Sequence, residues 1–107
     1  MSIRLVVVAI AFCWSIAAFG QVKIGLMVSA TGPTSAIGIP QKNTGDMLPK
    51  KIGDVTVEYI QLEDGGDTTR AVQNVKKLIQ ENNIDALIGP STTPNALAIL
   101  EDRKSVV

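Results

Sequence analysis

Three adjacent hydroxyl side chains, Ser91, Thr92 and Thr93, follow a short apolar run and precede Pro94. Proline is favoured in the first turn of a helix, so this hydroxyl cluster is expected at a helix N-terminus. Free backbone amides and the helix dipole favour an anion there, and hydroxyl groups add hydrogen-bond donors. The pattern is typical of a site for a small carboxylate. It is equally typical of a threonine that caps the helix beside solvated neighbours.

A second group of chemically active side chains is acidic and consists of Glu63, Asp64 and Asp67. Carboxylates grouped in a turn can hold a hard metal ion or accept a phosphoryl group. A structural interpretation is favoured, because Asp67 stands where it can cap the next helix and Glu63 stands at the end of an apolar run. We therefore predict no metal site in this turn.

The composition excludes most common catalytic chemistries. The 107 residues include no histidine and one cysteine, Cys13. Ser-His-Asp and Cys-His catalysis, histidine zinc sites and an internal disulfide are therefore excluded. Ten basic residues balance ten acidic ones, and this neutrality argues against nucleic acid as a partner. We predict a protein that is not an enzyme and that needs no cofactor.

The first 20 residues have the pattern of a cleavable secretory signal peptide. Arg4 precedes the apolar stretch 5–19, and small residues at Ala18 and Gly20 suit a signal peptidase. The stretch is shorter than the roughly 20 residues that span a bilayer as a helix, which disfavours the alternative of an uncleaved anchor. Cys13 lies inside the apolar stretch, which disfavours a lipoprotein. The predicted location is the periplasm.

Beyond residue 20, apolar runs alternate with helical patterns. Such alternation predicts an α/β fold with parallel strands and right-handed crossovers. Ligands of such sheets bind outside the carboxyl ends of the strands. The expected strands are 22–29, 55–62 and 85–88, the expected helices are 41–48, 68–82 and 94–101, and the expected loops at the binding edge are 30–40, 63–67 and 89–93.

The helix over 68–82 has the clearest pattern. Its apolar residues recur with helical spacing and form one stripe, while glutamines and lysines occupy the other side. Asp67 supplies the cap. The residues predicted to form the stripe are Ala71, Val72, Val75, Leu78 and Ile79.

Several landmarks together resemble the start of periplasmic substrate-binding proteins of the branched-chain amino acid (Leu/Ile/Val) type, which serve ABC importers. The landmarks are Thr31-Gly32-Pro33 after the first strand, the acidic turn before a helix, and Ile88-Gly89-Pro90 before the hydroxyl cluster. The resemblance extends over about residues 22–101. It implies a type I periplasmic-binding-protein fold, of which this chain is a partial first lobe.

The resemblance also implies a set of ligand-binding residues. Thr93 stands where the family's carboxylate-binding serine or threonine usually lies, Thr92 lines the pocket beside it, and Ser91 belongs to the same loop. Ile37 stands where a side chain of the first loop covers the ligand, and it is aliphatic where an aromatic residue is often found. The ammonium contacts of the family come from a second lobe.

The implied function is capture of a small carboxylate, such as an amino acid, and its delivery to an ABC permease. The segment is not expected to be competent alone. One alternative is the ligand-sensing domain of a receptor. A weaker alternative is a free-standing α/β domain that accepts phosphate or binds Mg²⁺ through the acidic turn.

The last residues depart from the family pattern. Family members are several times longer, and after Ala98-Ile99 the pattern continues as apolar helix and then a strand. Residues 102–107 instead match the translation of a common sequencing-library adapter. We therefore expect residues 21–101 to be an incomplete N-terminal lobe and residues 102–107 to be non-native. A natural truncation or a frameshift is the alternative.

Overall fold

The computed structural model describes residues 20–105, so all but the last residue of the expected signal peptide lies outside the described residues. Within the described part, no helix has the length and apolar character needed to cross a membrane. Strands and helices alternate along the chain. In chain order they are β1 (Gln21–Val28), a short 3-10 turn η2 (Gly32–Thr34), α2 (Ser35–Asp46), β2 (Lys51–Ile52), β3 (Val55–Glu63), α3 (Thr68–Gln80), β4 (Ala86–Ile88) and α4 (Thr93–Ser105).

The four strands form one sheet in the order β2-β3-β1-β4. β1 lies between β3 and β4 and is parallel to both, with Val28 paired to Glu63 and Leu26 paired to Ile88. The predicted parallel α/β arrangement is therefore confirmed. Because the three strands run the same way, the segments that follow them leave the sheet at one common edge.

The antiparallel strand β2 was not predicted. Lys51 pairs with Thr56 and Ile52 pairs with Val55, so Gly53 and Asp54 form a two-residue hairpin loop. Gly53 has a φ of +59°, which glycine adopts without steric cost. A Gly-Asp pair between two short apolar runs is a hairpin signal that the sequence does contain.

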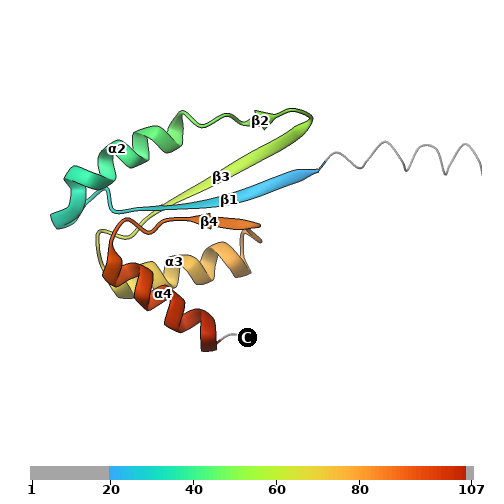
Figure 1. Cartoon of the computed structure of the whole chain (residues 1–107). Coiled ribbons are helices and arrows are strands. Elements are labelled where there is room, and N and C mark those ends of the chain that lie inside the picture. Colours follow the sequence, from blue (N-terminus) through green and yellow to red (C-terminus); the bar gives the residue numbers. More distant parts are fainter. Residues whose placement is uncertain (1–19, 106–107) are drawn as a thin grey trace, which may run out of the picture.

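Helices cover both faces of the sheet, with α2 on one face and α3 and α4 together on the other (Figure 1). The core lies on the α3 and α4 side, where buried side chains of β1, α3 and α4 meet. Of the predicted α3 stripe, Ala71, Val75 and Leu78 are buried and Val72 is half-buried. Ile79 is 52% exposed and lines a cavity of about 670 Å³ beside Leu87 and Leu100. The core cluster consists of Met27, Ala71, Val75, Leu78 and Ile99.

Helix α2 differs from the prediction, because it begins at Ser35 and ends at Asp46 instead of running over 41–48. Residues 35–40 were expected in a loop, since the segment 30–40 contains two glycines and two prolines. Pro33 lies in the 3-10 turn that leads into the helix, and Pro40 lies inside the helix. Gly38 serves close packing rather than a turn, which sequence patterns do not distinguish.

Helix α4 begins at Thr93, one residue before the prediction, and continues to Ser105. Its last turns include Asp102, whose carboxylate lies 3.4 Å from the amine of Lys76. The helix therefore extends into the segment 102–107. The non-native origin of that segment stays a prediction, because a helical conformation does not distinguish the alternatives.

Candidate functional site

Three connecting segments meet at the carboxyl edge of the sheet, as the sequence predicts. They follow β1, β3 and β4, and glycines allow them to approach closely. A Cβ atom at Gly38 would lie 1.9 Å from the carbonyl oxygen of Ser29, so α2 rests directly on the end of β1. Gly89 has a φ of +105°, and a Cβ there would lie 2.3 Å from the carbonyl oxygen of Met27. Backbone contact thus fixes the loops relative to β1.

Glu63 joins the segments that follow β1 and β3. Its carboxylate accepts hydrogen bonds from the backbone N–H of Thr31 at 3.0 Å, from the Thr31 hydroxyl at 2.8 Å and from the N–H of Gly65 at 2.7 Å. Burial raises the pKa of Glu63, but these hydrogen bonds and the charge of Arg70, 3.9 Å away, together bring it below its ordinary value. Glu63 is therefore a structural anion.

The other two acidic residues are also engaged by the protein itself. Asp64 is fully buried and accepts hydrogen bonds from the Ser29 hydroxyl at 2.5 Å and from the N–H of Gly66 at 2.8 Å. Asp67 caps α3 through the N–H of Arg70 at 2.7 Å. Within residues 20–105, no group of three or more acidic, cysteine or histidine side chains could hold a metal ion. The geometry of the acidic turn gives the Mg²⁺-binding alternative no support.

The three residues of the hydroxyl cluster have different surroundings. Ser91 is half-buried and its hydroxyl donates a hydrogen bond to the side-chain oxygen of Gln41. Thr92 directly precedes α4, and its carbonyl oxygen accepts a hydrogen bond from the N–H of Ala96 at 3.1 Å. The Thr92 hydroxyl oxygen is buried with no partner among the described residues. Thr93 is exposed at the first residue of α4. Thr93 therefore faces solvent at the start of α4.

Ile37 lies in the first turn of α2. It is 56% exposed, and it precedes Gln41 by four residues, so both side chains lie on one side of the helix. Because Gln41 contacts Ser91, this side of α2 faces the segment between β4 and α4. The hydrogen bond between Gln41 and Ser91 thus links α2, which carries Ile37, to the segment that carries the hydroxyl cluster.

A cavity of about 410 Å³ lies between α2 and the sheet. Gln41 and Ser91 both line it, and the remaining surface is mostly apolar, with Leu26, Val28 and Ile88 from the sheet. The hydrogen bond between Gln41 and Ser91 therefore joins α2 to the segment after β4 at the wall of this cavity.

Sequence reasoning missed Gln41, Ser29 and Asn95. A glutamine on a helix is usually solvated, so Gln41 carries no signal of its contact. Asn95 is fully buried, and both polar atoms of its amide lack a partner among the described residues. It precedes the core residue Ile99 by four positions, and that helical spacing could have predicted its burial.

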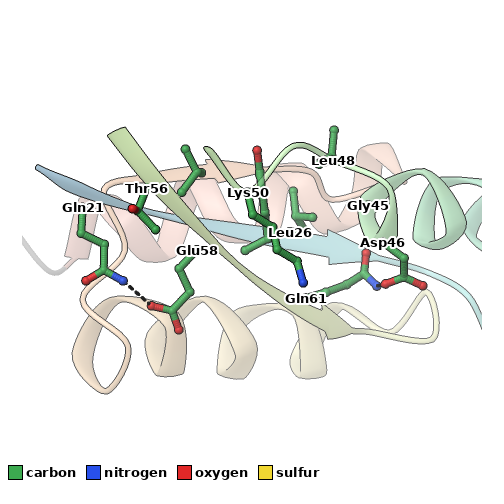
Figure 2. Close-up of a pocket in the computed structure, with 11 residues that line it drawn as sticks. Gln21, Leu26, Gly45, Asp46, Leu48, Lys50, Thr56, Glu58 and Gln61 are labelled. Carbon is green, nitrogen blue, oxygen red and sulfur yellow. Dashed lines mark hydrogen bonds between the residues drawn. The ribbon is translucent and has the colours of Figure 1, made fainter. Parts of the chain in front are cut away.

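A second cavity, of about 500 Å³, extends from the first residues of β1 and β3 to the last turn of α2 (Figure 2). Four of its polar side chains form two pairs. Gln21 donates a hydrogen bond to Glu58 at 3.2 Å, and Gln61 donates one to Asp46 at 3.3 Å. The cavity contains none of the predicted site residues, so the candidate site is the loop edge.

Comparison with known proteins yields a family and a set of similar solved structures. The sequence model of the periplasmic binding protein family matches residues 21–105. An extracellular ligand-binding receptor from Rhodopseudomonas palustris HaA2 is 43% identical with a TM-score of 0.75, over 80% of this chain and 24% of that one. A second such receptor from Rhodopseudomonas palustris is 34% identical with a TM-score of 0.73, over the same shares.

A more distant structure shares the fold. It is the branched-chain amino acid transporter substrate binding protein LivJ from Streptococcus pneumoniae, in complex with isoleucine. It is 19% identical with a TM-score of 0.69, over 79% of this chain and 26% of that one. No curated protein matches the sequence. The chain spans about a quarter of the length of these solved structures.

Proposed function

Because this chain belongs to the periplasmic binding protein family, we propose that it is part of the solute-binding component of an ABC importer. In this proposal the protein captures a small carboxylate, such as an amino acid, in the periplasm. It then delivers the ligand to a membrane permease. It performs no catalysis and uses no cofactor.

The observation that carries this proposal is the position of the hydroxyl cluster. It lies at the N-terminus of a 13-residue helix, at the edge where three loops meet, and Thr93 is exposed there. The first amides of a helix have no acceptor within it, so they are free to bind a carboxylate. We assign Thr93 and these amides to the ligand carboxylate, with Thr92 and Ser91 beside them. Ile37 covers the aliphatic part.

The test is a titration of the protein expressed from its uninterrupted reading frame. Isothermal titration calorimetry with isoleucine, other amino acids and simple carboxylates measures the affinity of the unaltered protein and of Thr93→Ala. A hydrogen bond to a charged group contributes about 1.5–3 kcal/mol, so the substitution should weaken binding roughly 10-fold or more. Thr69→Ala is the matched control, because Thr69 is also exposed in the first turn of a helix.

Two results would contradict the proposal. One is an unaltered protein that binds none of these carboxylates. The other is binding that Thr93→Ala and Thr69→Ala leave equally unchanged. The alternative of a receptor's ligand-sensing domain uses the same site, and gene context separates the two. An importer component is expected beside permease and ATPase genes, whereas a sensor is expected in one frame with a signalling domain.

A further inference from the structure

Gln41 connects two elements that carry the proposed binding residues. It lies in the middle of α2, and its side-chain oxygen accepts a hydrogen bond from the hydroxyl of Ser91, 50 residues later in the chain. Ile37 stands one turn before Gln41 on α2, and Thr92 and Thr93 follow Ser91 directly. One contact therefore links the segment with the aliphatic residue to the segment with the hydroxyl cluster.

The contact between Gln41 and Ser91 lies where α2 leaves the surface of the sheet. The first half of α2 is held on β1 by the close approach of Gly38 to Ser29, and from there the helix rises away from the sheet (Figure 1). The 410 Å³ cavity occupies the space that opens between α2 and the sheet, and Gln41 and Ser91 line the same cavity. The hydrogen bond joins the two sides where α2 departs from the sheet.

We infer that Gln41 is a positioning residue that fixes the spacing between α2, which carries Ile37, and the segment after β4, which carries the hydroxyl cluster. That spacing would set the size of side chain that the ligand carries. The inference rests on the proposed function, since the spacing matters only if a ligand binds there. Gln41 acts through Ser91. Without its acceptor oxygen, the segment after β4 loses a hydrogen bond that ties it to α2, so the spacing is no longer fixed by this contact.

The chemistry of the contact defines informative substitutions. Ser91 is the donor, so the requirement at residue 41 is an acceptor oxygen of the right reach. Gln41→Glu keeps an acceptor, whereas Gln41→Met keeps the length of the side chain and removes the acceptor. Ser91→Thr keeps the hydroxyl and Ser91→Ala removes it. Gln73→Met is the matched control, because Gln73 is an exposed helical glutamine on α3.

The first experiment needs no ligand. Urea unfolding of the protein from its uninterrupted reading frame is measured for Gln41→Met, for Ser91→Ala and for the double variant. A neutral hydrogen bond predicts that each single variant lowers the folding constant roughly two- to tenfold and that the double variant lowers it no further. Gln41→Glu and Gln73→Met should stay close to the unaltered protein. Additive effects of the two single variants would overturn the inference.

The second experiment measures specificity. The unaltered protein, Gln41→Met and the control Gln73→Met are titrated with alanine, valine, isoleucine and phenylalanine. We expect Gln41→Met to change the ratio of affinities for the largest and smallest ligands at least threefold, and Gln73→Met to preserve it. If Gln41 had a purely structural role, Gln41→Met would lower the affinity for every ligand by the same factor, and that result would overturn the inference. Loss of all binding in the unaltered protein would instead contradict the proposed function, and the unfolding cycle would still decide whether the contact exists.

Discussion

Replacement of Gly38 by alanine tests whether α2 rests on β1 as the structure has it. The added Cβ would lie 1.9 Å from the carbonyl oxygen of Ser29, 2.1 Å from its carbonyl carbon and 2.5 Å from the nitrogen of Ala30. All three neighbours are backbone atoms, so no side-chain rotation relieves the overlap. A Cβ is essentially never closer than 3.0 Å to a heavy atom of a residue that is distant in the chain, so α2 and the Ser29 backbone must move apart by at least 1.1 Å.

The expected magnitude combines two opposing effects. Alanine is better than glycine in a helix interior by about 1 kcal/mol. Overpacking typically costs 1–3 kcal/mol, and contact with rigid backbone places this site at the upper end. We therefore expect Gly38→Ala to lower the free energy of unfolding by about 2 kcal/mol. Gly45→Ala, in the same helix, is the control, since its Cβ would approach the far end of the flexible Gln61 side chain at 2.3 Å.

The assay is urea unfolding followed by far-UV circular dichroism, on the protein expressed from its uninterrupted reading frame. With a slope of about 2 kcal/mol per molar urea, Gly38→Ala should lower the midpoint by about 1 M. Gly45→Ala gains helix propensity without a backbone clash, so its midpoint should lie between that of the unaltered protein and about 0.5 M above it. A midpoint for Gly38→Ala equal to or higher than that of the unaltered protein would refute the reasoning, because the gain in helix propensity would then meet no larger cost from a clash.

Three further predictions concern other contacts of the loop edge. Glu63 has a lowered pKa, so its contribution to stability should be complete above the ordinary value of 4.5 and should disappear as the pH falls through the lower folded-state pKa. Urea midpoints measured between pH 3 and 7 should therefore show that Glu63→Gln loses less stability on acidification than the unaltered protein does. The same pH profile for both proteins would contradict this. Asp67→Ala should cost about 1 kcal/mol in urea unfolding through loss of the α3 cap, whereas Asp67→Asn should cost only a few tenths; equal costs would argue against capping. Asn95→Leu should raise the free energy of unfolding by about 1 kcal/mol, because it removes two buried polar atoms without partners, and a lower melting temperature would show that these atoms do have partners.

The fold could be predicted from the sequence where the signals are local. The stripe of α3 has helical spacing, and Asp67 is found as its cap, as predicted. The start of α2 was mispredicted because Gly38 and Pro40 signal a loop in isolation, and only packing against Ser29 explains a glycine inside the helix. β2 was missed because two residues give too short a pattern.

For the candidate site, too, the sequence predicted the location and not the contacts. Parallel strands end at one edge, so the meeting of the three loops follows from element order alone. The sequence did not predict which side chains touch there. Ser91 contacts Gln41, Ser29 contacts Asp64, and Thr31 contacts Glu63, and these pairs are 50, 35 and 32 residues apart in the chain.

The sequence by itself determined the family, the alternation of strands and helices, and the edge at which a ligand is expected. Hydrophobic periodicity, caps and short motifs carry this information, because they depend on residues within a few positions of one another. Only the tertiary structure decided that Glu63 and Asp64 are used for internal hydrogen bonds and that Gln41 joins α2 to the hydroxyl cluster. Those facts depend on how closely separate elements pack, and close packing is a property of the folded chain.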